Sequence, residues 1–462
     1  LFEKERRKVG VVVLNKLSQR EKRNRVNITT QQQKKMDIKQ VEDGLKVLKD
    51  DKVVANLNLE KQKHQELDAG SALQMFLDRI PVSSIPGIKN SPVVELKTGD
   101  SIKDAIQLLY DKNVSGALIA ADAVDPDTTF GRSSDQYMGF IDFVSLVLWS
   151  LEECEKANVQ AKENGGNGTG TGSFFTMLKQ SPEISQTKVG ELAKCFLWDP
   201  FFPVHLDDTL FHVLLLLSKH HRLQAVPVID QSGFQVIGFA TQNAVIQLLL
   251  QSSGLGWFDG IADKALSEFR FESEVRVVIL YSNQSLAEAL SMLWESRIGA
   301  VAVVNRETEK IIGCLRNSDV YLLLEHHELL NDRKSLTMRE FIHMETAKDN
   351  VDPTVDQDLG AFLSAGVLRL RSSVLPRMYA PVTARRSNTL KQVMYMLTET
   401  KSSHCFLLDD SQRPTGMLTL RDIIIQFAPP CIDSSIRGGG FFESALEQTG
   451  CQVKDGTIVC DN

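Results

Sequence analysis

Hydroxyl and carboxylate side chains lie where several apolar strands are expected to pass into helices. The last of these points reads Thr419-Leu-Arg-Asp422. An earlier one has Arg316 and Asp319 at the same spacing, and another has Thr241. A Ser, Thr or Asp at the start of a helix accepts hydrogen bonds from the free backbone amides there. The same groups can bind a polar ligand, so helix capping and ligand binding both stay open.

The residues that could do catalysis or bind a metal do not form a known motif. The chain has no Gly-x-Ser-x-Gly nucleophile turn, no His-Arg-Asp kinase loop and no Walker lysine. The Gly-rich run 164–172 lacks a phosphate-loop register, and no strand leads into it, so we interpret it as a linker. No Cys and His spacing is typical of a zinc site. We therefore expect no enzyme activity, no required cofactor and no metal.

The elements that must position these side chains follow one pattern that occurs four times. In the last copy an extended segment from Pro381 is followed by a helix from Thr389 to Thr400, an apolar strand at 405–409 and a strand led by Gly416. A second helix then follows. One such unit cannot bury both faces of its sheet alone, so the copies must pack on each other. The clefts between the copies are the expected place for a ligand.

The four copies align on two landmarks, the hydroxyl that opens the first helix and the glycine that leads the last strand. The number of residues between these two landmarks is nearly equal in three of the copies. In the first copy the separation is longer because an insertion, 122–136, is rich in Asp, Thr and Ser, which predicts a surface loop. The hydroxyls that open the first helix are Ser101, Thr209, Ser285 and Thr389. The glycines that lead the last strand are Gly139, Gly238, Gly313 and Gly416.

Bulk composition indicates a soluble protein with more than one domain. The chain has 462 residues, of which 42% are hydrophobic and 24% charged. No apolar run approaches the roughly 18 residues that cross a bilayer. Seven scattered cysteines without a Cys-x-x-Cys pair favour a reduced compartment. The net charge of −7 disfavours nucleic-acid binding, although residues 1–35 are strongly basic, and Met36 is a candidate start of the native chain.

The domain organisation follows from the repeats and from the polar or Gly-rich stretches between them. Low hydrophobicity and high charge predict that the N-terminal extension is disordered. The expected parts are a disordered extension 1–64, an N-terminal helix and linker 65–92, repeat 1 at 93–150, a flexible Gly-rich linker 151–190, repeat 2 at 191–252, repeat 3 at 261–326, a helical linker 327–379, repeat 4 at 380–428 and a C-terminal tail 429–462.

Three segments carry a resemblance to a known family: Phe140-Ile-Asp-Phe143, 294–304 and 416–422. The repeats resemble cystathionine beta-synthase (CBS) domains. Four of them in one chain resemble the gamma regulatory subunit of AMP-activated protein kinase, and the sequences of the three segments are similar to those of plant gamma-like subunits. The resemblance covers about residues 65–430. It implies an α/β (α+β) fold in which each tandem pair packs sheet to sheet, and the two pairs form a disc with four clefts.

The resemblance also implies adenine-nucleotide binding through Ser/Thr-x-x-Asp, where the last strand enters the last helix. The carboxylate can accept both ribose hydroxyls, and the helix amides can receive phosphate. Thr419 and Asp422 match this signature in full. Asp319 keeps the acid, while Arg316 either binds phosphate or fills the cleft as an internal salt bridge. The other candidates are Thr241, which lacks the acid, and the helix-opening Thr209, Ser285 and Thr389.

The first repeat and the phosphate side depart from the family pattern. Asp142 and Ser145 hold the two chemistries in reversed order. The position of a His-Arg pair that gamma subunits often use falls on Ser403 and His404 in the fourth repeat. Because a charge-assisted contact is worth about 1.5–3 kcal/mol, losing two of them would weaken nucleotide binding strongly.

As a function, the resemblance implies a non-catalytic regulatory subunit of a plant Ser/Thr kinase of the AMP-activated or sucrose-non-fermenting type. Its expected partners are a catalytic alpha subunit and a scaffolding beta subunit, with AMP, ADP or ATP as regulatory ligands. No nucleic acid or membrane partner is expected, and the expected location is the cytoplasm or the nucleus. Two alternatives stay open: a degenerate scaffold subunit that senses no nucleotide, and an adenosyl-responsive regulator of another enzyme or transporter in trans.

Overall fold

The structure is a computed structural model in which the chain divides into two compact units, Leu1–Asp68 and Ala69–Asn462. The extension expected to be disordered, the insertion 122–136 and most of the Gly-rich run lie outside the described residues. Those residues are 73, 75–120, 137–163, 172–194, 199–220, 223–232, 235–271, 277–344, 368–371, 375–428, 451–454 and 457–460.

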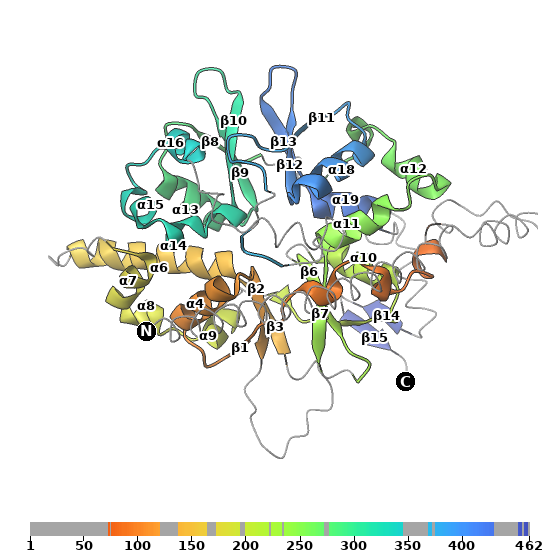
Figure 1. The fold of residues 1–462 in the computed structure, drawn as a ribbon, viewed down its shortest axis with the longest axis horizontal. Coiled ribbons are helices and arrows are strands. Elements are labelled where there is room, and N and C mark those ends of the chain that lie inside the picture. The colour runs from red at the N-terminus through yellow and green to blue at the C-terminus, as the bar shows by residue number, and fades with distance from the viewer. Residues whose placement is uncertain are drawn as a thin grey trace, which may run out of the picture. The chain divides into compact units, whose positions relative to one another are not determined.

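Four copies of one strand–helix–strand–strand unit, each followed by helical residues, make up the second unit of the chain (Figure 1). Repeat 1 consists of β1 (Glu95–Lys97), α4 (Ile102–Lys112), β2 (Gly116–Ala120), β3 (Tyr137–Asp142) and α6 (Phe143–Glu163). Repeat 2 consists of β5 (Val204–His205), α10 (Leu210–Lys219), β6 (Ala225–Ile229), β7 (Val236–Thr241) and α11 (Gln242–Leu250).

The second half of this unit repeats the order, with one change after the last strand of repeat 3, where a 3₁₀ turn precedes the helix. Repeat 3 consists of β8 (Ile279–Tyr281), α13 (Leu286–Ser296), β9 (Ala300–Val304), β10 (Ile311–Arg316), the turn η5 (Asn317–Asp319) and α14 (Leu322–Glu325). Repeat 4 consists of β11 (Thr383–Arg385), α18 (Leu390–Thr400), β12 (His404–Leu408), β13 (Pro414–Thr419) and α19 (Leu420–Phe427).

The strand register is the same in all four sheets. In each, the first strand runs parallel to the second, and the second pairs antiparallel with the third. The first residue of the second strand always faces the last residue of the third, in the pairs Gly116–Asp142, Ala225–Thr241, Ala300–Arg316 and His404–Thr419. This shared register confirms the prediction of four repeats.

A backbone hydrogen bond closes the same end of every sheet. The N–H that follows the third strand donates to the carbonyl that precedes the second strand. The four bonds are Phe143 to Ser115, Gln242 to Gln224, Asn317 to Gly299 and Leu420 to Ser403, at 2.8–3.1 Å. We call this end of each sheet the junction, because the chain leaves the last strand there and turns toward the helix.

The hydroxyls predicted to open the first helix of each repeat are its N-caps. Ser101, Ser285 and Thr389 each accept a hydrogen bond from the amide three residues later, and Thr209 does not. Ser285 and Thr389 also receive the reciprocal contact of a capping box, from Glu288 and Gln392. The caps satisfy amides that the helix cannot pair itself, which is why a hydroxyl recurs at this position.

The repeats pack as two tandem pairs, sheet to sheet. Leu118 of repeat 1 lies in a buried cluster with Ala225 and Phe239 of repeat 2. Ala302 of repeat 3 lies in another with Phe406 of repeat 4. Helices then join the pairs: α6 contacts α13, and α10 and α11 contact α19 and α18. Each repeat therefore buries one face of its sheet against its tandem partner, as the repeat pattern predicted.

In each tandem pair, the segment that precedes the first repeat contacts the second repeat, and a segment that follows the first repeat contacts the first repeat. Isolated bridges join Lys188, which lies between repeats 1 and 2, to Ser101 of repeat 1, and Pro81, which precedes repeat 1, to Thr209 of repeat 2. The second pair shows the same exchange, in the bridges Thr337–Ser285 and Ala265–Thr389. The segment that enters each pair thus supports that pair's second repeat.

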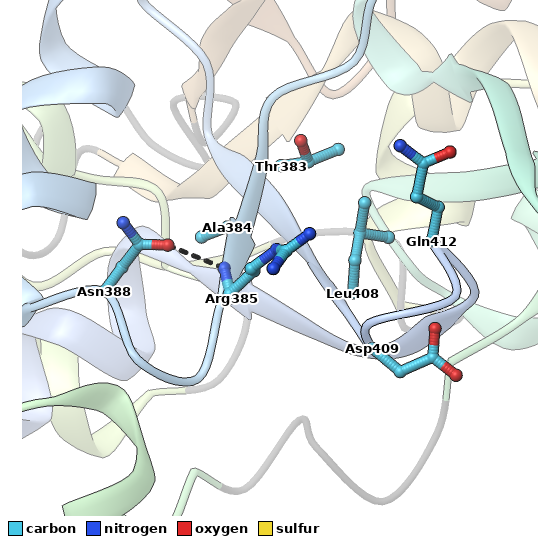
Figure 2. Close-up of a pocket in the computed structure, with 7 residues that line it drawn as sticks. All are labelled: Thr383, Ala384, Arg385, Asn388, Leu408, Asp409 and Gln412. Carbon is cyan, nitrogen blue, oxygen red and sulfur yellow. Dashed lines mark hydrogen bonds between the residues drawn. The ribbon is translucent and has the colours of Figure 1, made fainter.

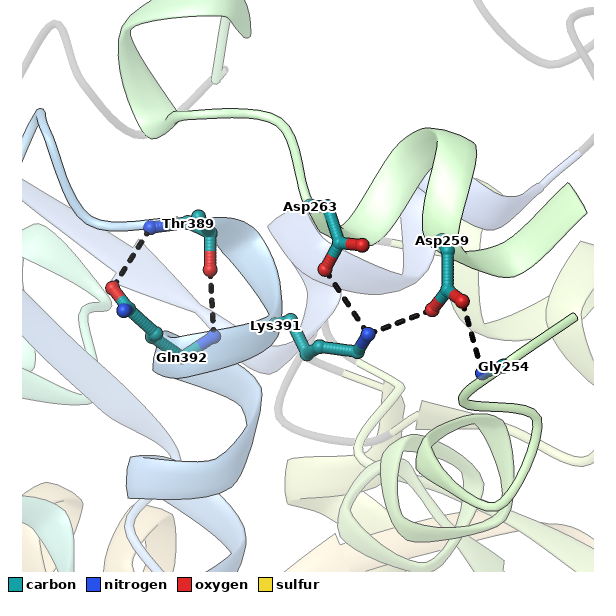
Figure 3. A network of polar contacts seen from close by, with 6 residues as sticks. All are labelled: Gly254, Asp259, Asp263, Thr389, Lys391 and Gln392. Carbon is teal, nitrogen blue, oxygen red and sulfur yellow. Dashed lines mark hydrogen bonds and ion pairs between the residues drawn. The ribbon is translucent and has the colours of Figure 1, made fainter. Parts of the chain in front are cut away.

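A charged network fixes one of these crossing segments (Figure 3). Lys391 Nζ on α18 contacts Asp259 Oδ1, within helix α12 (Gly256–Ala262), at 2.7 Å, and Asp263 Oδ1, just after that helix, at 3.0 Å. Asp259 Oδ2 also accepts from the Gly254 N–H at 2.9 Å. One lysine therefore ties the connection between the tandem pairs to repeat 4.

Two expectations about the connecting segments need correction. The linker expected at 151–190 is largely helical, because α6 continues to Glu163 and is followed by α7 (Phe174–Gln180) and α8 (Pro182–Ser185). Among the described residues of the linker expected to be helical at 327–379, α15 (His327–Asp332) and α16 (Met338–His343) lie at its start, and Arg369 forms a β-bridge with Val114. In both cases packing against the repeats decides the conformation, which local composition cannot reveal.

The remaining elements are short. Strand β4 (Asp199–Pro200) adds a fourth strand to the sheet of repeat 1, and α9 (Val189–Lys194) precedes it. The tail contains a hairpin of β14 (Cys451–Lys454) and β15 (Thr457–Cys460). None of the helices in the described part of the chain combines the length and the apolar character that a bilayer crossing requires.

Candidate functional site

The junction of repeat 4 brings Thr419 and Asp422 together. Thr419 Oγ1 accepts from the Asp422 backbone N–H at 3.2 Å. In return Asp422 Oδ2 accepts from the Thr419 backbone N–H at 2.7 Å and from its hydroxyl at 2.5 Å. Asp422 is only 3% exposed. The two residues therefore form a reciprocal cap of α19, and this cap fixes the orientation of the carboxylate at the end of the sheet.

The junction of repeat 3 holds a buried salt bridge between Arg316 and Asp319. Arg316 Nε donates to Asp319 Oδ2 at 2.9 Å, and Nη2 donates to Oδ1 at 2.7 Å. Arg316 Nη1 donates to the Pro376 carbonyl at 2.9 Å. Both side chains are 7% exposed. Of the two arrangements that the sequence left open for Arg316, the structure has the internal salt bridge, which engages both oxygens of Asp319.

His404 lies between these two junctions. It is the first residue of β12, faces Thr419 in the sheet register, and is 6% exposed. Burial, with a smaller contribution from the nearby Arg316 guanidinium, lowers the pKa of His404 to about 3. Its Nδ1 lies 3.1 Å from Ser403 Oγ. At neutral pH His404 is therefore an uncharged hydrogen-bonding group and not the cation that the family pattern places here.

The depressed pKa of His404 predicts a pH-dependent loss of stability. An unfolded histidine titrates near pH 6.5, so below that pH the unfolded chain binds a proton that the folded chain excludes down to about pH 3. His404 does not reduce the free energy of unfolding above about pH 6.5, and it lowers that free energy progressively as the pH falls from 6.5 towards 3. Compared with His404→Gln, wild type should lose about 2 kcal/mol more unfolding free energy between pH 7.5 and about pH 4.5, by urea denaturation. Parallel pH profiles would contradict this assignment.

The other two junctions contain helix caps of different chemistry. Thr241 Oγ1 accepts from the Ala244 N–H at 3.1 Å, and Ala244 leaves that junction without an acid. In repeat 1 the order is reversed, with Asp142 accepting from the Ser145 N–H at 2.8 Å and from its hydroxyl at 2.6 Å. Burial raises the pKa of Asp142. All four junctions thus share a position, and repeat 4 combines a hydroxyl with an acid in the order Thr-x-x-Asp.

The helix-opening hydroxyls lie at the opposite end of their sheets from the junctions. Because the first and second strands are parallel, the first helix begins beside the end of the second strand, as Arg385 opposite Leu408 shows. The junction instead lies beside the start of that strand, at His404. Within one repeat the structure therefore does not bring Thr209, Ser285 or Thr389 to the junction residue.

Two surface pockets also lie away from the junctions. The first, about 300 Å³, is lined by residues of the β11 edge and of the turn between β12 and β13: Thr383, Ala384, Arg385, Asn388, Leu408, Asp409 and Gln412 (Figure 2). The second lies at the matching turn of repeat 2, beside Asp230 and Gln235. Both adjoin the strand ends opposite to Thr419 and Thr241, so neither contains the predicted acid.

Sequence reasoning missed the part that the segment before repeat 4 plays at these junctions. Pro376 supplies the carbonyl that binds Arg316, and Leu368 reaches the sheets of repeats 1 and 2. A backbone carbonyl leaves no side-chain signal. The proline could have given a warning, since a residue that precedes proline is biased away from helix.

Comparison with known proteins assigns the repeats to a family. The CBS domain family matches residues 189–251 and 377–428, which contain repeats 2 and 4. These two segments of the chain are CBS domains. Repeats 1 and 3 have the same strand register as the two matched segments, so the structure extends the CBS architecture to all four repeats.

Relatives of this protein include regulatory subunits of protein kinases. It is 27% identical over 412 residues to SNF1-related protein kinase regulatory subunit gamma-1 of Arabidopsis thaliana, covering 84% of this chain and 90% of that protein. It is 24% identical to the gamma-1-like subunit of the same plant, covering 88% and 94%. A solved structure from Methanocaldococcus jannaschii shares 13% identity, covers 76% of this chain and 100% of that one, and has a TM-score of 0.45. The chain is thus similar to gamma-type regulatory subunits over most of its length.

Proposed function

We propose that this protein is the non-catalytic gamma-like subunit of a SNF1-related kinase complex. It would bind a catalytic alpha subunit and a scaffolding beta subunit in the cytoplasm or nucleus, and it would take AMP, ADP or ATP at the junction of repeat 4. The similarity to the Arabidopsis gamma subunits along nearly their whole length supports the kinase partners.

The observation that carries the nucleotide proposal is the Thr419–Asp422 pair at the end of the repeat 4 sheet. A carboxylate accepts two ribose hydroxyls well, because hydrogen bonds to a charged oxygen are short and strong. The cap already holds Asp422 at the N-terminus of α19, where helix amides favour a negatively charged group. Neutral His404 on the adjacent strand offers a further hydrogen-bonding group without bringing a charge.

The direct test of this function is reconstitution. The full chain should coelute on size exclusion with a SNF1-related catalytic subunit and its scaffolding subunit, and AMP should change the activity of that complex by a fewfold, a coupling of about 1–3 kcal/mol. Kinase and scaffold without this chain serve as the control for the AMP effect. Elution of the chain alone, with the kinase unaffected, would exclude the proposal.

A second candidate, a scaffold subunit that senses no nucleotide, is favoured by one specific observation. Arg316 and Asp319 satisfy each other within the junction of repeat 3, so neither is free to bind phosphate or ribose without breaking a buried pair. Under this alternative the chain still assembles with the kinase. The reconstituted complex would then show the same activity with and without AMP, which separates the two candidates.

A further inference from the structure

Residues 368–371, here called the strap, lie across the start of β2 in repeat 1. Arg369 forms an antiparallel bridge with Val114. The Leu368 carbonyl accepts from the Ser115 N–H at 3.3 Å, and the Leu370 N–H donates to the Asn113 carbonyl at 3.3 Å. The strap therefore pairs with repeat 1 as a short additional strand, although it precedes repeat 4 in the chain.

The strap is bound at the junction of repeat 1. Ser115, which donates to the strap, also accepts from the Phe143 N–H at 2.8 Å, and Phe143 follows Asp142. By register, Asp142 takes the place that Thr419 takes in repeat 4, because each faces the first residue of the second strand. The strap thus occupies, in repeat 1, the neighbourhood in which repeat 4 is proposed to bind nucleotide.

The side chain of Leu368 fills apolar space between the paired sheets. It packs against the buried cluster that includes Leu118 of repeat 1 and Phe239 of repeat 2. Its backbone N–H donates to Ser91 Oγ at 2.8 Å. One residue therefore supplies both an apolar contact and backbone hydrogen bonds, which is how an extended peptide binds to a sheet edge.

Arg371 anchors the other end of the strap between repeats 1 and 3. Its guanidinium carbon lies 4.1 Å from the ring centre of Tyr110 and 5.8 Å from that of Tyr321. Its Nε lies 2.7 Å from Glu325 Oε1, an ion pair in which the N–H is not aligned with the oxygen. Its backbone N–H donates to Asn113 Oδ1 at 2.9 Å. Two aromatic faces and a carboxylate form a cation site that the chain itself fills.

We propose that the junction of repeat 1 is a peptide-binding site that the strap fills in cis, and that the bound strap keeps nucleotide out of repeat 1. The occupant is an extended segment with an apolar residue followed by an arginine. Because Tyr321 and Glu325 belong to repeat 3, release of the strap would also loosen the contact between the two pairs. The nucleotide part of this inference rests on the proposed function, whereas binding of the strap does not.

Hydrogen exchange of the full chain, followed by mass spectrometry without nucleotide, tests the binding of the strap. Arg371→Ala should raise exchange about tenfold or more in peptides covering 110–116 and 368–371 together, since it removes the anchor and local opening controls exchange. Arg377→Ala, a substitution of an exposed arginine nearby in the same connection, should change neither. Unchanged or uncoupled exchange would overturn the proposal. Equally faster exchange in α18 would also overturn it, because the strap would then be part of the core.

An AMP titration of the same variants tests the exclusion of nucleotide. Arg371→Ala should bind one more equivalent of AMP than wild type, and AMP should restore protection of 110–116. Equal stoichiometry would contradict exclusion by the strap. If neither protein binds AMP, the proposed nucleotide function fails, while the exchange experiment still decides whether the strap is a bound and releasable segment.

Discussion

Asp319→Ala should lower the unfolding free energy by about 3–5 kcal/mol, because it leaves the Arg316 guanidinium buried without its counter-charge. The side chain of Arg316 is 7% exposed, so water cannot replace the two hydrogen bonds that the carboxylate accepts. Burial lowers the pKa of Arg316, but the Coulombic attraction and hydrogen bonds of Asp319 outweigh it and raise the pKa, so the variant loses the interactions that offset the cost of burying the charge. Urea denaturation at pH 7.5 measures the loss.

Two further variants make this result specific. Arg316→Met combined with Asp319→Leu removes both charges and should recover most of the lost stability, since a buried ion pair contributes little beyond an apolar pair of similar size. Arg413→Ala removes a second arginine ion pair, with Glu309, whose side chains are about half exposed, and should cost less than about 1 kcal/mol. A similar loss for Asp319→Ala and Arg413→Ala would show that burial of the Arg316 pair is not what matters.

The salt bridge between Arg316 and Asp319 also distinguishes the junction of repeat 3 from that of repeat 4 as a possible nucleotide site. The two junctions flank the same pair of sheets and share His404 as a neighbour. One uses its acid to hold an arginine of its own, and the other presents its acid within a helix cap. If the chain binds nucleotide in its second pair, we therefore expect a single site, at Asp422.

The fold could be predicted from the sequence because its main signals are local. A hydroxyl such as Thr389 caps the helix that follows it, and a glycine such as Gly416 lies within the last strand, two residues after the strand begins at Pro414, so the two recur at nearly constant spacing in three of the four copies. The cap at Thr419 and Asp422 is local in the same sense, three residues apart on one turn. Such contacts depend on few residues, and propensity and pattern describe them well.

The contacts that could not be predicted join distant parts of the chain. Arg371 contacts Tyr110, which lies in repeat 1 and is far from Arg371 in the sequence. Whether Arg316 binds Asp319 or a ligand likewise depends on residues that surround it in the fold, and in the structure it binds Asp319. The bridge between Arg369 and Val114 gives residues 368–371 a partner in repeat 1 that no local rule describes. The neutral state of His404 likewise follows from burial, with a smaller contribution from Arg316 of repeat 3.

The proposed nucleotide site depends on the charge of one carboxylate. Asp422→Asn keeps oxygen to cap α19 but removes the charge that ribose hydroxyls would bind. The expected loss is about 1.5–3 kcal/mol of binding free energy, or about 10- to 100-fold in the AMP dissociation constant. Asp104→Asn is the matched control, because Asp104 makes a similar cap with Ser101 on α4, with Oγ–Oδ2 at 2.6 Å.

Calorimetric titration of AMP into the full chain, wild type beside Asp422→Asn and Asp104→Asn, therefore tests the central claim most directly. Thermal unfolding of each variant beforehand shows whether loss of the cap alone changes stability. We predict a saturable heat for wild type and Asp104→Asn, and binding weakened at least tenfold for Asp422→Asn. Equal affinity in all three proteins, or no heat in wild type, would contradict the claim that Asp422 holds a nucleotide.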